Sequence, residues 1–475
     1  AWRCAFTPMS ADASAGSDTA PRQSTGVADA AAPARLATSL CLGWGIGSLG
    51  MSLMFSATGV LMLRYLTDYA GVAAGVAGLL IGLSKFYDAL VDPLVGAASD
   101  RTRGRWGRRR PYLLWGGLLS AVSFALIFQL DAVDPSLKVA AALVVLLLNA
   151  SGYALFNVPY LAMPGEMTDD YHERTRLMSF RVAAVAAGQL LAASVGPLLI
   201  LAFGGGAPGH QRTAWLLAAI IAIASVASFL STRDAPAKLV PHAAFGLGAQ
   251  VRAAFSNQPF MLVLGVKRTS LLGLSIFMAV LPYLFTWVMK VSYQYLSLYF
   301  LLQASLMLLS QPLWVAVTRR IGKKRAYVVG SLVTSLSLCS WLLAGPAEPA
   351  WAIMLRGAIY GLGGGGLMLI GQSMLPDVME HDARLTGTRR EGVLAGVYTT
   401  VEKLSFSIGP SLVGLVLEAT DYVGSASGDV VQPAAALRAM YACIAVLPTL
   451  SILVGCVMLR WYRLDDGVRP SRAGT

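Results

Sequence analysis

Charged residues are scarce in this chain. Lys, Arg, Asp and Glu together make up 13% of its 475 residues, whereas an average soluble domain has roughly 25%. Hydrophobic residues make up 56%. This balance excludes an ordinary soluble globular protein and predicts a polytopic membrane protein.

Histidine and cysteine are also few, and neither forms a ligand pattern. The chain has 4 His and 5 Cys, and the cysteines show no CxxC or related spacing. We therefore expect neither a metal cluster nor a disulfide framework. The net charge of +12 lies mainly in short loops between apolar runs, where it sets topology, so we expect no nucleic-acid partner.

Signatures of enzymes and of ATP-driven pumps are missing. The sequence has no GxxxxGK[ST] loop for a nucleotide and no HExxH or GxSxG motif for catalysis. We therefore expect a protein that is not an enzyme and that needs no cofactor. Transport by such a protein would draw its energy from a gradient.

Apolar runs of membrane-spanning length recur along the chain. A helix needs about 17–25 apolar residues to cross the hydrocarbon core. The runs lie near 39–66, 71–99, 111–130, 138–164, 177–203, 213–231, 258–289, 292–317, 325–345, 350–375, 392–418 and 434–461. We therefore predict an all-α integral membrane protein with twelve transmembrane helices.

A polar break at 232–257 divides these runs into two sets of six, and a basic loop follows the second run of each set. Duplicated halves of this kind occur in secondary transporters, whose sites lie near the midplane between the halves. The predicted organisation is a disordered cytoplasmic tail at 1–38, an N-terminal six-helix bundle at 39–231, a central cytoplasmic linker at 232–257, a C-terminal six-helix bundle at 258–462 and a cytoplasmic tail at 463–475.

Basic loops predict the orientation in the membrane. The segment 101–110 has six arginines and 319–325 has five basic residues, whereas the loops at 131–137, 204–211, 346–349 and 419–433 have no Lys or Arg. By the positive-inside rule, both termini are cytoplasmic. We expect a plasma-membrane protein, in the inner membrane if the source is bacterial, that contacts lipid and functions as a monomer.

Asp88 and Asp92 lie inside the apolar run 71–99. Four residues apart on a helix, they share one face, and a carboxylate at bilayer depth costs roughly 2.5–3.5 kcal/mol on insertion scales. A bound cation, a proton, a basic partner or a water-filled path would offset this cost. The pair is therefore a candidate functional site, and a buried ion pair with Lys85 or another intramembrane base is the alternative.

Three blocks of the sequence resemble one transporter family. Asp88–Pro111 is similar to its second helix and following loop, and Asn157–Arg181, with PY, ExT and ER elements, to its fourth helix and following loop. Met374–Tyr422 is similar to its tenth-to-eleventh loop and eleventh helix. The family is that of the glycoside-pentoside-hexuronide cation symporters, the melibiose-carrier group of the major facilitator superfamily.

This resemblance implies a fold and a function. The fold is that of the major facilitator superfamily, and the function is symport of a cation with a small sugar, glycoside or uronide by alternating access. On matching positions, Asp88 and Asp92 would bind the coupling cation, and Lys403 would be the eleventh-helix lysine. A carboxylate that loses its cation could accept this ammonium instead.

Departures from the family pattern bear on the coupling ion. The sodium-coupled melibiose carriers have a polar residue where this chain has Val91 and a hydroxyl where it has Ala154. A hard cation needs several oxygen ligands, whereas a proton needs one carboxylate. Proton coupling is therefore favoured, with sodium at Asp88 and Asp92 as the alternative.

The residues at the expected solute site also differ from the family pattern. Ser52 replaces an Asp of the first helix, and Asn157 and Leu161 replace an acid and a tryptophan of the fourth, so a galactoside of the melibiose kind is disfavoured. The further candidates for solute binding are Tyr153, Tyr160, Tyr398, Lys267 and Arg268. The two adjacent bases also leave anionic solutes open, as well as an amphiphile such as a lysolipid moved by the same fold.

Charged residues near the predicted cytoplasmic ends are candidates for gating. They resemble the superfamily's gating loop, and we expect a salt-bridge layer between the halves; a role in topology alone or a solvated loop face is the alternative. These candidates are Asp100, Arg105, Arg108, Arg109, Arg110, Glu166, Arg174, Asp377, Arg389, Arg390 and Glu391.

Overall fold

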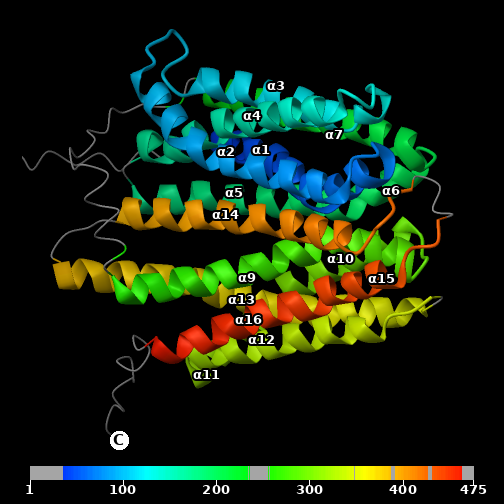
Figure 1. The fold of residues 1–475 in the computed structure, drawn as a ribbon. Helices are drawn as coiled ribbons and strands as arrows, with labels where there is room; N and C mark the ends of the chain where they lie inside the picture. Colours follow the sequence, from blue (N-terminus) through cyan, green and yellow to red (C-terminus); the bar gives the residue numbers. More distant parts are fainter. Residues whose placement is uncertain are drawn as a thin grey trace, which may run out of the picture. The chain divides into compact units, whose positions relative to one another are not determined.

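The computed structural model describes residues 36–168, 170–233, 235, 255, 257–346, 348–386, 391–425 and 430–462. The part of the chain from Leu36 on forms one compact unit, and its regular structure is helical throughout the described residues (Figure 1). The predicted tails at 1–38 and 463–475 and the predicted linker lie mostly outside these residues. The predicted division into two bundles stays a prediction, and we keep "N-terminal half" (38–232) and "C-terminal half" (258–461) as names.

In the described residues, the N-terminal half has seven numbered helices and four short helical turns. Their bounds are α1 (Thr38–Ala57), η1 (Thr58–Met62), η2 (Tyr65–Tyr69), α2 (Ala74–Arg101), α3 (Arg110–Ile127), η3 (Leu130–Ala132), α4 (Lys138–Met167), α5 (Tyr171–Leu190), η4 (Leu191–Val195), α6 (Gly196–Ala202) and α7 (Gly206–Thr232).

The C-terminal half has the remaining elements. Their bounds are α9 (Gln258–Tyr283), η5 (Leu284–Val288), α10 (Tyr293–Leu309), α11 (Gln311–Ile321), α12 (Lys323–Ser340), η6 (Trp341–Leu343), α13 (Ala350–Thr386), α14 (Glu391–Glu418), α15 (Ala434–Tyr441), η7 (Ala442–Val446), α16 (Leu447–Met458) and η8 (Leu459–Trp461).

Eleven helical stretches of the described residues are long and apolar enough to cross a membrane, and α10 with α11 forms a pair bent by 45°. Taken as one span, this pair makes the number twelve, and the predicted fold class is confirmed. The bend lies at Ser310, just before Pro312. Proline has no N–H for the helix ladder, which accounts for a break at this point. Helix α13 runs beyond the predicted 350–375 to Thr386.

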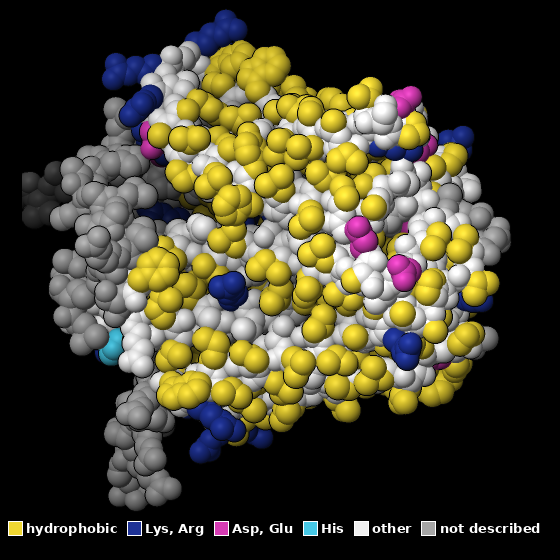
Figure 2. Space-filling view, viewed as in Figure 1, with side chains coloured by type: hydrophobic (Ala, Val, Ile, Leu, Met, Phe, Trp, Pro, Cys, Tyr) yellow, Lys and Arg dark blue, Asp and Glu magenta, His cyan; other side chains and the backbone are white. Residues whose placement is uncertain are grey.

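The surface fits a membrane environment. Figure 2 shows hydrophobic side chains over most of one face of the unit, with charged side chains mainly toward the ends of the helices. Leu94, Leu308 and Ile223 are among the large hydrophobic residues that are about 70% exposed. Lipid covers such a surface without cost, and helices satisfy their backbone hydrogen bonds internally, as the hydrocarbon core requires.

The helices lie side by side, so the connections gather at two ends (Figure 1). We call the end with the loops 102–109 and 322 the basic end, and the end with the loops 70–73, 289–292, 419–425 and 430–433 the distal end. The two halves meet where α10 packs on α6 and η4, where α9 packs on η1, and most extensively where α2 packs along α14. This pairing positions the candidate site.

Candidate functional site

Lys403 of α14 lies between the two carboxylates of α2. Its Nζ is 3.1 Å from Asp88 Oδ2 and 2.5 Å from Asp92 Oδ2, and Asp88 is only 2% exposed. The structure thus brings together the three residues to which the sequence analysis assigned coupling, from the two halves of the chain. We call them the charge trio.

Small residues allow α2 and α14 to approach closely. A Cβ on Gly78 would lie 2.6 Å from the carbonyl oxygen of Pro410, and one on Gly414 would lie 2.3 Å from that of Ala74. Ser411 Oγ donates a hydrogen bond of 2.9 Å to the carbonyl of Gly78. Close packing of this kind is typical of small residues between membrane helices, and it brings Lys403 within reach of α2.

Lys85, the alternative partner of the acids, takes another position. Its Nζ lies 5.2 Å from the ring centre of Phe55, a cation–π distance, while the ion pairs of Asp88 and Asp92 are with Lys403. The carboxylate pair is therefore bridged across the two halves rather than neutralised within α2.

Helix α4 covers the trio from the N-terminal half. The ring centre of Tyr153 lies 5.3 Å from Lys403 Nζ, and the hydroxyls of Tyr87 and Ser151 form a hydrogen bond of 3.1 Å that joins α2 to α4. Asn157 follows Tyr153 by four residues, so it shares that face of α4. Tyr153 and Asn157 therefore lie on the face of α4 nearest to the trio.

Arg181 of α5 belongs to the same region, and the sequence analysis assigned it no role. It interacts electrostatically with both Tyr153 and Tyr160, and its Nε is buried with no hydrogen-bond partner among the described residues. A buried donor without a partner is costly, so this guanidinium is suited to a ligand. The sequence did contain a signal for this residue, since Arg181 is a charged side chain inside the predicted span 177–203.

Lys267 of α9 forms a second cluster with α14. Its Nζ lies 3.9 Å from Glu402 Oε2 and 5.2 Å from the ring centre of Tyr398, whose hydroxyl is buried and unpartnered among the described residues. Arg268 is exposed instead, so the two adjacent bases face different surroundings. Glu402 was missed, although a glutamate inside a predicted span is the same signal that identified Asp88.

Ser52 and Tyr160 make their hydrogen bonds within the N-terminal half. Ser52 Oγ donates to the carbonyl of Val185 at 3.0 Å. Tyr160 Oη accepts from Ser48 and donates to the carbonyl of Trp44, both at 2.9 Å, and the Tyr160 ring stacks on that of Trp44. Packing between α1, α4 and α5 explains these positions, and solute binding by either residue stays a prediction.

The arginine-rich loop at the basic end pairs with acids of its own half. Arg108 Nη2 is 2.5 Å from Glu166 Oε1, and Arg109 pairs with the same carboxylate and with Asp100, the latter at 3.0 Å. Arg105 stacks on Trp106, and Arg110 donates to the carbonyl of Ala235. These contacts tie the ends of α2, α3 and α4 together.

The remaining gating candidates also pair locally or lie outside the described residues. Arg174 donates to the carbonyl of Thr168 at 3.1 Å, and Asp377 pairs with Lys323 at 2.5 Å within the C-terminal half. The sequence analysis expected a salt-bridge layer between the halves, whereas each of these ion pairs lies within one half. Arg389, Arg390 and the Glu391 side chain lie outside the described residues.

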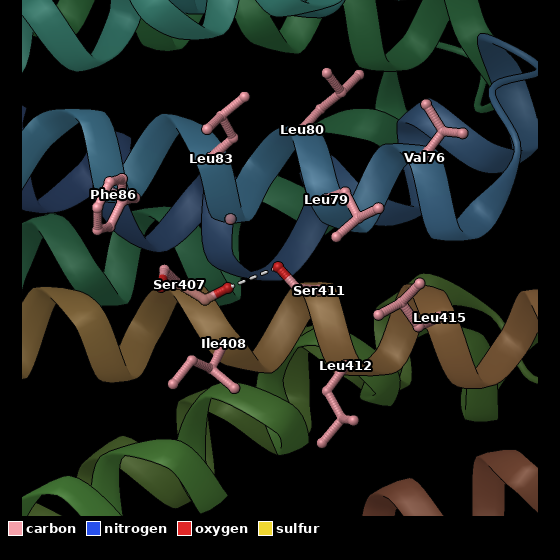
Figure 3. A pocket seen from close by; sticks show the side chains of 11 residues that line it. Val76, Leu79, Leu80, Leu83, Phe86, Ser407, Ile408, Ser411, Leu412 and Leu415 are labelled. Atoms are coloured by element: carbon pink, nitrogen blue, oxygen red, sulfur yellow. Dashed lines mark hydrogen bonds between the residues drawn. The ribbon is translucent and has the colours of Figure 1, made fainter.

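An apolar groove of about 580 Å³ runs between α2 and α14 toward the distal end (Figure 3). Its lining is almost entirely hydrophobic and includes half-exposed residues such as Leu79, Leu83 and Phe86. The groove begins about one helical turn from the charge trio, since Phe86 and Ser407 lie close in sequence to Asp88 and Lys403.

The chain is similar to transporters over nearly its full length. Residues 43–466 match the family described as MFS/sugar transport protein. The putative glycoside/cation symporter YagG of Escherichia coli (strain K12) is 27% identical over 90% of this chain and 92% of its own. The isoprimeverose transporter of Lactiplantibacillus pentosus is 25% identical, with 89% and 88% covered. The glucuronide carrier protein homolog of E. coli (strain K12) is 26% identical, with 90% and 92% covered.

Solved structures show the same fold at lower identity. The crystal structure of a D-xylose-proton symporter superposes with a TM-score of 0.63 at 16% identity and covers 91% of this chain and 99% of that one. The fold, the family match and the relatives agree with the resemblance seen in the three sequence blocks. The chain therefore belongs to the MFS/sugar transport protein family and to the glycoside-pentoside-hexuronide symporters within the major facilitator superfamily.

Proposed function

We propose that this protein is a secondary active transporter that couples the entry of one cation to the uptake of a sugar, glycoside or uronide. The observation that supports this most is the charge trio, in which an ammonium of one half lies between two carboxylates of the other. A buried ion network that bridges the two moving parts of a transporter can link ion occupancy to conformation.

The charge balance of the trio supports a single coupling ion. Two carboxylates and one ammonium sum to one negative charge, so one monovalent cation neutralises the three groups of the trio; the side chain of Lys85, which also interacts electrostatically with Asp88, is not counted in this sum. A cation on the carboxylates competes with Lys403 for the same oxygens and weakens the bond between α2 and α14. Binding of the ion thus favours separation of the halves at this level, and its release lets Lys403 return.

We propose that this ion is a proton. Asp88 Oδ1 and Asp92 Oδ1 are buried without hydrogen-bond partners among the described residues, and one proton on either carboxylate would use such an oxygen. Sodium would need several oxygen ligands. In the part of the chain that the structure describes, no third His, Cys, Asp or Glu side chain joins the two carboxylates.

For the solute site, we propose the region between α4, α5 and α14. Asn157 can donate and accept hydrogen bonds to sugar hydroxyls, Tyr153 offers an aromatic face and Arg181 a free donor. Arg181 would also pair with a carboxylate, which keeps uronides among the solutes. The glycosides and the glucuronide in the names of the relatives agree with this choice.

We further propose that the protein is a multi-pass monomer of the plasma membrane with both termini in the cytoplasm. The basic loops of the basic end support this orientation by the positive-inside rule. Solute would then enter the cell from the distal end.

The groove of Figure 3 favours a second candidate function, transport of an amphiphile. It is apolar, half exposed and adjacent to the joint between the halves, so an acyl chain could enter it from the bilayer. A lysolipid would then follow the conformational change with its tail in this groove.

Solute-induced currents on supported membranes distinguish these functions. The purified protein in liposomes is given a panel of xylosides, isoprimeverose, glucuronides and lysolipids, at two pH values and with or without sodium. A current with one sugar class that depends on pH and not on sodium supports the proposal. Binding of a lysolipid with no sugar-induced current would overturn it in favour of the second candidate.

A further inference from the structure

Six polar residues at the distal end join the two halves far from the charge trio. Arg64, Thr67 and Asp68 come from the N-terminal half, and Tyr283, Tyr293 and Tyr422 from the C-terminal half. We propose that this distal-end cluster is a gate, which holds the distal end closed in the conformation seen here and must open before solute can enter from that side.

Three hydrogen bonds of the cluster cross from one half to the other. Tyr422 Oη donates to Asp68 Oδ1 at 2.6 Å, and the hydroxyls of Thr67 and Tyr283 are 2.9 Å apart. Arg64 Nη1 donates to Tyr293 Oη, and its guanidinium carbon lies 4.9 Å from the Tyr293 ring centre. Each of the three cluster residues from the N-terminal half thus has its own tyrosine partner in the C-terminal half.

The same contacts seal the distal end. The side chains that the distal end buries here are those of Arg64, Thr67, Asp68, Tyr283 and Tyr293. The backbone closes beside them, because Gly424 packs so tightly on Thr67 that a Cβ there would lie 2.4 Å from the Thr67 carbonyl oxygen. Solvent therefore reaches none of the five side chains freely.

The distribution of bonds suits a reversible contact. Asp68 keeps two partners within its own half when the halves part, namely Arg64 at 3.0 Å and Thr67 at 2.9 Å. Asp68 loses only its hydrogen bond from Tyr422, and water can replace this bond. The charged pair thus stays compensated in both conformations, which avoids the large cost of an unpaired buried charge.

Tyr422 is fitted to remain a neutral donor in this contact. Burial, and after it the charge of Asp68, raises the pKa of the Tyr422 phenol well above its usual value. The bond to Asp68 therefore persists over the physiological pH range. Ion pairs at the basic end, such as Arg108 with Glu166 and Lys323 with Asp377, lie within one half each, so the cluster is distinct from them.

A reporter cysteine beneath the cluster tests the proposal without any solute. Gly59 lies five residues before Arg64, and among the described residues a Cβ there would meet only Met278 of α9, at 3.9 Å. Met278 lies five residues before Tyr283, so this contact is about 7 Å deeper than the gate. Gly59→Cys is made in the full chain with the native cysteines replaced, and labelling by a membrane-impermeant maleimide from the distal side is followed over time.

We expect slow labelling of this cysteine when the cluster is intact. Tyr422→Phe and Tyr283→Phe each remove one crossing hydrogen bond with little change of shape. Because one such bond shifts an equilibrium by about threefold to tenfold, each should speed labelling by about that factor, and the double variant by more. Tyr441→Phe is the matched control, since Tyr441 bonds to the carbonyl of Ala344 within the C-terminal half.

Two further reporter cysteines check that the maleimide labels from the distal side and that each variant is folded. Gly345→Cys, at an open position of the distal end, should label quickly in every background, and Gly104→Cys, in the basic loop, should stay unlabelled in sealed cells. Three results with the Gly59→Cys reporter would overturn the proposal. They are fast labelling when the cluster is intact, a labelling rate that the two gate variants leave unchanged, and a rate that Tyr441→Phe raises as much as they do. Because no solute is used, this outcome is separate from failure of the proposed symport.

Discussion

The substitution Asp92→Asn is the most stringent single test of the proposed coupling. The asparagine keeps the shape of the side chain and can still accept a hydrogen bond from Lys403, but it removes one of the two negative charges. Asp88 and Lys403, 3.1 Å apart, then form a neutral pair. A cation no longer has a net charge to neutralise.

The expected magnitude follows from this lost charge. Two unit charges about 4 Å apart interact by roughly 4 kcal/mol at an effective dielectric constant of about 20. Loss of one such interaction weakens binding of the coupling cation by roughly a thousandfold. The ion then leaves the site empty at ordinary concentrations, and transport becomes independent of its gradient.

Two assays on the same liposomes separate coupling from movement. Uphill accumulation of the solute, driven by an imposed cation gradient, should be lost in Asp92→Asn. Exchange of labelled for unlabelled solute at equal concentrations should persist, because the solute region and the halves remain intact. Asp134→Asn, which changes an exposed carboxylate of a distal-end loop, is the control and should keep both activities.

Full accumulation by Asp92→Asn would refute the assignment of Asp92 to coupling. Loss of both accumulation and exchange in a well-folded variant would contradict the separation of the ion and solute sites.

Three further predictions concern Lys403, Arg181 and Tyr160. Lys403→Ala leaves two carboxylates without their buried cation, so the free energy of unfolding should fall by about 3–5 kcal/mol; a Tm equal to that of the parent would contradict the ion pairs. Adding Asp92→Asn to Lys403→Ala should restore part of the lost Tm, because one negative charge then goes as well. Arg181→Gln should weaken solute binding by about tenfold while the ion dependence of transport is kept, and an unchanged Kd by calorimetry would place the solute elsewhere. Tyr160→Phe should cost about 1–2 kcal/mol of stability, because the hydrogen bond to the Trp44 carbonyl is lost; an unchanged Tm would contradict this role, and a rise in KM would support the predicted contact of Tyr160 with solute.

The sequence predicted the membrane helices well, because span length and hydrophobicity are local properties. It also identified the charge trio from two intramembrane acids and a family resemblance. Which base would face the acids was open, since Lys85 and Lys403 are both intramembrane. The structure decides in favour of Lys403, which pairs with both acids where α14 packs closely on α2, and such packing between distant segments is not a local property.

Other features depended on tertiary contacts that the sequence pattern does not contain. Glu402 and Arg181 stand inside predicted spans, so their charge was a usable signal, but their neighbours come from other helices. The distal-end cluster combines a polar segment after α1 with tyrosines that are ordinary in membrane spans. At the basic end, the described ion pairs of the gating candidates lie within one half each, whereas polar bonds of the distal end cross between the halves; a salt-bridge layer that includes Arg389, Arg390 and Glu391 stays a prediction, because these side chains lie outside the described residues.

The number of cations that move with each solute molecule tests the central claim most directly. It is measured in liposomes from the ion gradient that balances a known solute gradient, with the solute identified in the panel of currents. The net charge of the trio predicts one cation per solute in the parent protein. A solute gradient that no ion gradient can balance, or a ratio of two cations, would contradict the account.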